Sequence, residues 1–288
     1  MNTMMTRRGM ISRTAATVGG VALAAQFAPL FAGEAKRRFK IGACEWSLRK
    51  SDPSSLELAK QIGLDGVLVN MGSVDNDLHL RQPAVQQAYL EAARKTGVEI
   101  SSLALAEMNK VPLKSDPRAE AWLADSIAVL TAMKLKIVLV AAFSKGDLYG
   151  DPAGIDHTVE VLKRLAPKAE RAGVIFGLEN YLSAAENLDL IQRVGSPAVQ
   201  VYYDVGNSTD KGYDIYKEIR MLKGKVCEFH AKDGKFMLGQ GRIDFQKVRE
   251  AMDDIQFGGW IHIEAATPHE LVADYQTDLN FLKGIFHA

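Results

Sequence analysis

Four short apolar runs in the C-terminal half of the chain each end in a residue that can ligate a metal ion. The runs cover residues 174–179, 199–204, 226–230 and 260–264. Their last residues are three carboxylates and one imidazole, namely Glu179, Asp204, His230 and Glu264. A single acidic residue after a strand is usually a helix N-cap or part of a turn. Four such endings in series indicate a shared site instead.

Three carboxylates held close together repel one another and raise each other's pKa unless a cation neutralises them. A divalent metal ion is the simplest such cation. Ligation by several oxygens and one imidazole suits Mn²⁺, Mg²⁺, Co²⁺ or Zn²⁺, and the majority of carboxylates favours the harder ions. We therefore expect Glu179, Asp204, His230 and Glu264 to hold one divalent ion.

The elements that position these residues alternate along the chain between strand-like and helix-like segments. The expected strands are 40–44, 66–70, 99–103, 137–142, 174–179, 199–204, 226–230 and 260–264. The expected helices are 56–62, 85–96, 119–133, 155–172, 187–194, 215–222, 245–254 and 271–286. Eight such units in about 250 residues predict an α/β fold, a single-domain (β/α)8 TIM barrel over residues 36–288. An open doubly wound sheet would carry a Gly-rich turn after its first strand, where Glu45, Trp46 and Ser47 stand instead.

Strand alternation gives the four endings a common direction. Side chains along a strand point to opposite faces in turn, so residues two positions earlier share the inward direction. Those include Glu228 and His262, which we expect either to orient the ligands or to form a buried polar pair. The residues immediately before the four endings then face the helices, and all are apolar or aromatic: Leu178, Tyr203, Phe229 and Ile263.

The N-terminus has the pattern of a secretory signal peptide. Arg7 and Arg8 precede a weakly hydrophobic stretch over 15–32 and small residues near a plausible cleavage point. We expect residues 1–35 to be a twin-arginine signal that sends the protein to the periplasm, or otherwise out of the cytoplasm. An ordinary Sec signal and an uncleaved anchor are the alternatives. No later apolar run is long enough to span a bilayer, so we expect no stable membrane insertion after signal removal.

The charge and the cysteines limit the classes of partner. The formal net charge is zero at pH 7, which gives no electrostatic reason to expect nucleic acid as a partner. The two cysteines, Cys44 and Cys227, fall on different expected strands and form neither a disulfide framework nor a zinc motif.

Residues 37–286 resemble the xylose isomerase-like barrel superfamily, described broadly as sugar phosphate isomerases and epimerases. This resemblance implies that the four endings bind one catalytic divalent ion. Family members are often dimers or tetramers, so the resemblance leaves a homo-oligomer open, although the sequence itself does not show the oligomeric state. The matching pieces are Gly177-Leu178-Glu179-Asn180, Asp204-Val205-Gly206-Asn207, His230-Ala231-Lys232-Asp233, Gly239-Gln240-Gly241-Arg242-Ile243-Asp244-Phe245 and Ile263-Glu264.

The chemistry that suits this centre is movement of a proton next to a carbonyl group. A metal that binds two neighbouring oxygens of a hydroxy-ketone or hydroxy-aldehyde stabilises the enediolate formed when the α-proton leaves. The resemblance implies that Glu179 and Glu264 lie on opposite sides of the sugar as catalytic acid and base, with Asp204 and His230 mainly as ligands. The expected function is therefore a metal-dependent sugar isomerase or epimerase.

Five further residues are candidates for contact with the sugar or keto-sugar substrate. Lys232 shares the inward direction of His230, although an ion pair with Asp233 or Glu264 is the alternative. Trp46 offers an aromatic face to a sugar ring. The other candidates follow strand ends and would otherwise be turn or surface residues: Asn180, Asn207 and Glu107.

The chain departs from ketose 3-epimerases of the superfamily, which carry His and Arg where Asn207 and Phe236 stand here. That departure argues against a free-ketose 3-epimerase. The runner-up is a lyase that acts by β-elimination on keto-sugars or 3-keto-glycosides, because an α-carbanion can expel a neighbouring leaving group. An endonuclease IV-like nuclease would need more histidines, and a non-catalytic sugar-binding barrel would not need two opposed glutamates.

Overall fold

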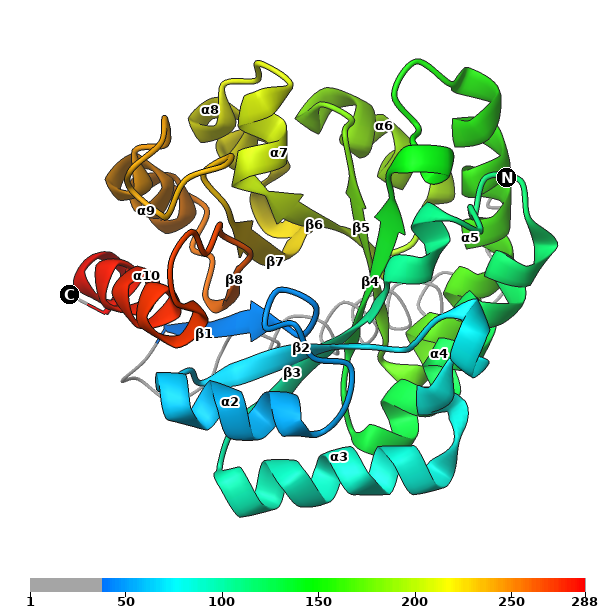
Figure 1. Ribbon diagram of the computed structural model, residues 1–288. Coiled ribbons are helices and arrows are strands. Elements are labelled where there is room, and N and C mark those ends of the chain that lie inside the picture. The colour runs from blue at the N-terminus through cyan, green and yellow to red at the C-terminus, as the bar shows by residue number, and fades with distance from the viewer. Residues whose placement is uncertain (1–37, 288) are drawn as a thin grey trace, which may run out of the picture.

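Eight parallel strands close into a barrel in the computed structural model, which describes residues 38–287. Each strand pairs with its neighbours in chain order, and β1 pairs with β8 to complete the ring. Figure 1 shows the strands surrounded by an outer ring of helices. The predicted TIM barrel is therefore confirmed. The predicted signal peptide over residues 1–35 lies outside the described residues.

The strands match the expected runs closely, with small differences at the rim. Strands β5 and β7 each extend one residue past the predicted ligand, whereas β8 ends one residue before Glu264. The Glu264 amide nevertheless donates to the Ala231 carbonyl oxygen at 3.0 Å, so it continues the pairing. The strands are β1 Phe39–Cys44, β2 Gly66–Asn70, β3 Glu99–Leu105, β4 Ile137–Ala142, β5 Ile175–Asn180, β6 Val199–Asp204, β7 Val226–Ala231 and β8 Gly259–Ile263.

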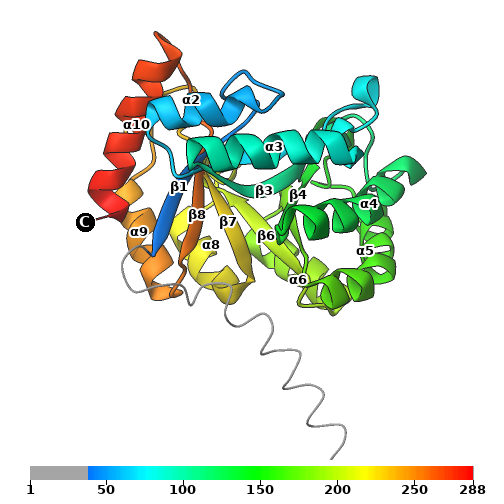
Figure 2. The ribbon, with the colours of Figure 1, turned by 90° about the horizontal axis from the view of Figure 1, so that it is seen from below.

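The helices cover the outside of the barrel, and α10 completes their ring beside β1 and α2 (Figures 1 and 2). One helix, α7, was not expected and begins directly after β6. Short 3-10 turns occupy several loops, including Ala106–Asn109 after β3. The α-helices are α2 Ser54–Ile62, α3 Pro83–Thr96, α4 Pro117–Met133, α5 Pro152–Ala172, α6 Ala184–Val194, α7 Val205–Asp210, α8 Ile215–Leu222, α9 Phe245–Asp254 and α10 Leu271–Phe286.

Local chemistry sets the ends of the helices. The Asp116 carboxylate caps α4 by accepting the Arg118 amide, and Asp151 caps α5 in the same way. Helix α5 ends at Gly173, whose φ of 67° lies in the left-handed region that favours glycine. These caps fix where the outer helices begin and end, and the loops at the C-terminal rim are the part of this fold that carries side chains for chemistry.

Two β-bulges change the direction of side chains inside the barrel. The register shifts between β2 and β3 and between β6 and β7, which leaves Ser101 and Cys227 as extra residues. A bulge sends two consecutive side chains to the same face. Ser101 and Ser102 therefore both face the interior, as do Cys227 and Glu228, and polar groups gather beneath the rim.

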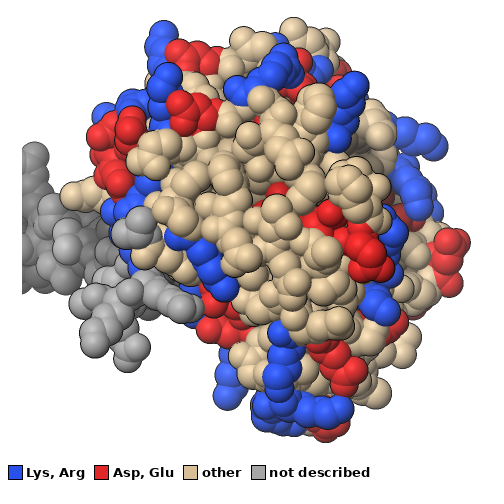
Figure 3. Space-filling model, turned by 60° about the vertical axis from the view of Figure 1, so that its left-hand side comes forward, with Lys and Arg blue, Asp and Glu red and all other residues tan. Residues whose placement is uncertain are grey.

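The surface carries no single-sign field on the face shown in Figure 3, where basic and acidic side chains are interspersed around an uncharged middle. This distribution agrees with the zero formal net charge of the chain. Among the described residues, no helix is both long and apolar enough to cross a bilayer.

Candidate metal centre and active site

The four predicted ligands converge at the C-terminal rim of the barrel. One ligand atom from each of Glu179, Asp204, His230 and Glu264 lies within 4.8 Å of all the others. Nδ1 of His230 is 2.8 Å from Glu179 Oε1, 3.8 Å from Glu264 Oε2 and 4.0 Å from Asp204 Oδ2. Three carboxylates thus face one ring nitrogen, which is the arrangement that the strand endings predicted.

His230 is held from its other side by a residue of β1, which β8 separates from β7 in the barrel. Cys44 Sγ, at the end of β1, lies 3.2 Å from Nε2 of His230. The Tyr202 ring packs against the imidazole with a centroid separation of 4.6 Å. Burial raises the pKa of the Cys44 thiol to about 12, so this partner stays uncharged. These contacts leave Nδ1 directed toward the carboxylates.

Asp204 has one oxygen that the protein satisfies and one that it does not. Oδ1 caps α7 by accepting the amides of Gly206 at 2.7 Å and Asn207 at 2.8 Å. Oδ2 is buried and has no hydrogen-bond donor. Burial raises the pKa of Asp204 to about 7, although Lys232 opposes the shift. A buried acceptor that faces other ligand atoms and lacks a donor fits a metal ligand, so the residues present suit a divalent ion.

Both oxygens of Glu264 have donors. Oε1 accepts from Nε1 of Trp46 at 2.7 Å, and Oε2 accepts from the ammonium of Lys232 at 3.1 Å. Burial raises the pKa of Glu264, but His230 and Lys232 outweigh burial and lower it below its usual value. Trp46 therefore contacts Glu264, a candidate catalytic residue, through its ring N–H. Its ring also packs edge-on against His230, with the ring centroids 6.2 Å apart.

Lys232 lies beside two of the four ligands. Its Nζ is 3.1 Å from Glu264 and 3.9 Å from Asp204 Oδ2. Burial lowers the pKa of Lys232, but these carboxylates outweigh burial and hold it above its usual value. Of the two ion pairs considered from the sequence, the one with Glu264 is present, while Asp233 accepts backbone amides instead.

The remaining substrate-contact candidates have partners of their own. The side chain of Asn180 exchanges hydrogen bonds with Asn187 and accepts the Leu182 amide at 2.8 Å, so it orders the loop after β5. Glu107 lies in the 3-10 turn after β3 and forms an ion pair with Lys110 at 3.2 Å. Their contact with a substrate stays a prediction, as does that of Asn207 at the start of α7.

A layer of hydrogen-bonded polar groups lies beneath the four ligands. His262 Nδ1 is 2.6 Å from the Tyr202 hydroxyl, and its Nε2 is 2.7 Å from the Ser101 hydroxyl. Glu228 accepts from the Ser102 hydroxyl at 2.6 Å. Glu228 and His262 themselves approach only to 3.9 Å. Glu228 and His262 thus do not bond to each other. Ser102 holds Glu228, and Ser101 holds His262.

Burial disfavours the charged forms of both His262 and Glu228 in this lower layer. Burial lowers the pKa of His262 well below its usual value, and the positive charge of His230 adds to this effect. Burial also raises the pKa of Glu228 to about 8.

Two residues of the site were missed from the sequence, and both belong to the end of β1. Cys44 contacts His230, but a lone cysteine in an apolar run gives no signal of such a role. Glu45 is fully buried and accepts from Ser55, Tyr89 and the Asn70 amide, and burial raises its pKa to about 7. It anchors the segment that carries Trp46. Glu45 directly follows a strand, so the rule applied to later strands would have identified it.

An aromatic cluster at the rim was also missed. Phe143 and Tyr181, which follow β4 and β5, pack edge to face with centroids 4.7 Å apart. The ammonium of Lys211 lies over the rings of Tyr181 and Tyr149, at 4.4 and 4.3 Å from their centroids. Aromatic residues in the first positions after neighbouring strands are the signal that could have predicted this wall.

Two curated relatives of this chain are named as epimerases of phosphorylated substrates. It is 26% identical to 2-epi-5-epi-valiolone 7-phosphate 2-epimerase of an Actinoplanes species over 197 residues, which cover 68% of this chain and 73% of that protein. It is also 26% identical to L-ribulose-5-phosphate 3-epimerase of Shigella boydii over 232 residues, which cover 73% of this chain and 80% of the relative.

Solved structures show the same fold. D-psicose 3-epimerase, crystallised in the presence of D-fructose, superposes with a TM-score of 0.73 at 15% identity, covering 86% of this chain and 100% of that one. The family model described as xylose isomerase-like TIM barrel matches residues 56–285, which is most of the chain. The protein therefore belongs to the xylose isomerase-like TIM barrel family.

Proposed function

We propose that the protein is a divalent-metal-dependent sugar isomerase or epimerase that moves a proton on the carbon next to a carbonyl group. The observation that carries this proposal is the convergence of the four ligand atoms, among which Asp204 Oδ2 has no donor. The named relatives are epimerases, and they support an activity of this kind.

Glu179, Asp204, His230 and Glu264 would hold the ion. The chemistry supplied by a bound divalent ion is Lewis-acid stabilisation of the negative charge that develops on substrate oxygens when the proton leaves. Three of the four proposed ligands are carboxylates, and this majority favours Mn²⁺ or Mg²⁺ over softer ions.

Glu179 and Glu264 act as the acid and base. They come from β5 and from the end of β8, on either side of the strands that carry Asp204 and His230. One carboxylate takes the α-proton, and the other gives a proton to the opposite face of the carbon in an epimerisation. Trp46 and Lys232 hold Glu264 in place, and the Lys232 ammonium also donates to an oxygen that becomes negative.

Solvent exchange tests this proposal. The purified protein, incubated with keto-sugars in D₂O, should introduce deuterium at the α-carbon, and metal analysis should give about one divalent ion per chain. Glu179→Gln and Glu264→Gln should each abolish the exchange. Full exchange in both variants, or a protein that binds no divalent ion, would refute the mechanism.

A β-elimination is the second candidate, because it begins with the same proton abstraction. The observation that favours it is a pocket beside Lys232 that can receive a leaving group next to the centre. Product analysis separates the two reactions, since an epimerase yields an isomer of the same mass and a lyase yields two fragments.

We also propose that the protein is exported by the twin-arginine route, on the basis of Arg7, Arg8 and the stretch that follows them. Replacement of both arginines by lysine should leave the precursor in the cytoplasm. Processing and export that persist in this variant would indicate a Sec signal instead.

A further inference from the structure

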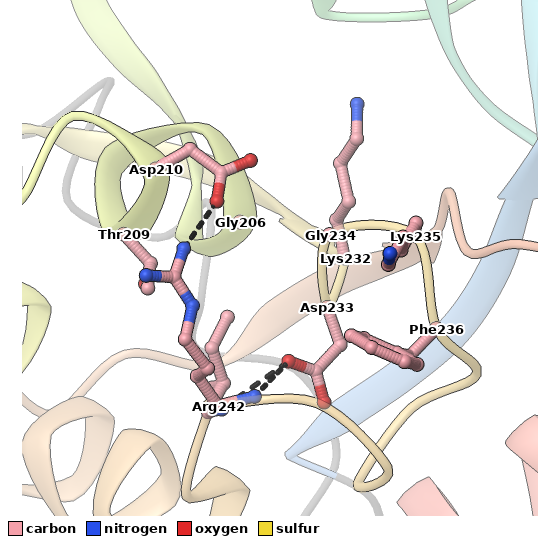
Figure 4. A pocket seen from close by; sticks show the side chains of 10 residues that line it. Gly206, Thr209, Asp210, Lys232, Asp233, Gly234, Lys235, Phe236 and Arg242 are labelled. Carbon is pink, nitrogen blue, oxygen red and sulfur yellow. Dashed lines mark hydrogen bonds and ion pairs between the residues drawn. The ribbon is translucent and has the colours of Figure 1, made fainter.

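A pocket of about 460 Å³ opens beside the metal centre, between α7 and the loop after β7 (Figure 4). We call it the loop pocket, and its lining includes Gly206, Asp210, Lys232, Lys235, Phe236 and Arg242. Two of these residues belong to both sites: the Gly206 amide donates to Asp204, and Lys232 donates to Glu264. The loop pocket and the metal centre therefore lie next to each other, with Gly206 and Lys232 between them.

The wall of the loop pocket is fixed by one buried carboxylate. Asp233 is 3% exposed and accepts backbone amides of the Gly-rich segment that follows it. Its Oδ2 accepts from Gly239 and Gly241, and its Oδ1 accepts from Arg242 and Ile243, all at 2.9–3.2 Å. The pocket is thus formed before any ligand binds.

The same four hydrogen bonds argue against a phosphate in this segment. Successive backbone amides in a glycine-rich loop form a concave site for anions. Here the Asp233 carboxylate already occupies that site, so its amides are not available to a phosphate group.

Two of the three basic side chains that line the loop pocket are paired with carboxylates, and Lys235 instead lies over the Phe236 ring. Arg242 forms an ion pair with Asp210, as Figure 4 shows, and Lys232 is paired with Glu264. Asp210 would repel a phosphate dianion. The paired guanidinium and carboxylate instead offer donors and acceptors side by side, which suit neutral hydroxyl groups.

Phe236 supplies an apolar surface in this polar surrounding. Its side chain is 43% exposed, one of the few large hydrophobic residues that the described part of the chain leaves open to solvent. Lys235 lies with its ammonium 5.6 Å from the ring centroid. An open aromatic ring next to hydroxyl-binding groups matches a sugar ring, which has C–H faces and hydroxyl edges.

We propose that the loop pocket binds a second, uncharged sugar unit, so that the substrate is a glycoside rather than a sugar phosphate. The keto-sugar unit lies at the metal centre, and the other unit rests on Phe236 between Lys235 and the Arg242–Asp210 pair. This inference rests on the proposed function. It names the substrate class for the same centre.

A matched pair of substrates tests the proposal through kinetics. 3-Keto-glucose and 3-keto-cellobiose share the reacting unit and differ only in the second sugar. We expect the isolated holoenzyme to exchange the α-proton of the disaccharide with the higher kcat/KM, and Phe236→Ala to reduce this preference about tenfold. Met221→Ala, which truncates a similarly exposed side chain on α8, should leave both values unchanged.

Binding measured by saturation-transfer NMR gives a readout that does not depend on catalysis. Cellobiose should bind the wild-type holoenzyme, and it should bind the Phe236→Ala variant more weakly. Inorganic phosphate should not displace it. Equal kcat/KM for the two keto-sugars, or phosphate that displaces cellobiose, would overturn the glycoside proposal while α-exchange itself upholds the proposed function. If no keto-sugar undergoes exchange but cellobiose still binds in a way that depends on Phe236, the proposed function is refuted and the sugar-binding role of the loop pocket is retained.

Discussion

Sγ of Cys44 lies 3.2 Å from Nε2 of His230, on the side of the imidazole that faces away from the three carboxylates. If His230 held a divalent ion through Nδ1, its ring proton would be on Nε2, where the Cys44 sulfur could accept it. The contact joins the end of β1 to the end of β7, so the barrel itself sets the direction of the ligand.

Removal of the Cys44 thiol should weaken metal binding. Loss of a partner behind a ligating histidine typically costs about 10- to 100-fold in metal affinity. We expect Cys44→Ala to show a loss of this size by calorimetric titration with Mn²⁺, and Cys44→Ser to retain part of the affinity. Cys227→Ala is the matched control, because Cys227 is an equally buried thiol that bonds to the Val201 carbonyl oxygen. Equal affinities in both alanine variants would show that Cys44 only fills space.

Trp46→Phe removes the ring N–H that donates to Glu264 at 2.7 Å and keeps an aromatic ring in place. A hydrogen bond to a charged group contributes about 1.5–3 kcal/mol, so kcat/KM for α-proton exchange should fall about tenfold or more. Metal content should stay the same, because Lys232 still holds the other oxygen. The control is Trp122→Phe, a buried tryptophan on the outer helix α4. If Trp46→Phe and the control have the same kcat/KM, the Trp46 N–H does not position Glu264 for catalysis.

The convergence of the four candidate ligands could be predicted from the sequence, because parallel strands place their ends at one rim and alternation sets one direction for each ending. Ser101 and Cys227 show where that reasoning stops. Each is the extra residue of a bulge, and an apolar or mixed run shows no local sign that its alternation shifts by one residue. The Cys44–His230 contact was equally hidden, since it joins residues 186 positions apart.

The pKa of Asp204, raised by burial from 3.8 to about 7, predicts how the metal-free protein responds to pH. The folded state binds the Asp204 proton more tightly than the unfolded state does. The folded metal-free protein therefore becomes less stable as the pH rises from about 4 to about 7. Asp204→Asn removes the charge and keeps an oxygen to cap α7. Its stability advantage over the metal-free wild type should therefore grow from about pH 4 to about pH 7 and then level off.

Thermal melts of the two metal-free proteins across that pH range measure this difference. Addition of Mn²⁺ should reverse the order, because the ion binds the wild type more tightly and stabilises the folded state that binds it. Asp189→Asn, which removes an exposed carboxylate on α6, is the control for loss of one negative charge. A difference that is independent of pH would show that burial does not shift the titration of Asp204.

Asp233→Asn should destabilise the loop after β7. Each carboxylate oxygen of Asp233 accepts two backbone amides. An asparagine side chain at this position must turn its NH₂ group toward two of these N–H donors. We expect the free energy of unfolding in urea to fall by about 1–3 kcal/mol. Asp244→Asn is the matched control, since Asp244 caps α9 and asparagine caps helices about as well. If both variants unfold at the same urea concentration, the four hydrogen bonds do not stabilise the loop, and the wall of the loop pocket must be ordered by other contacts.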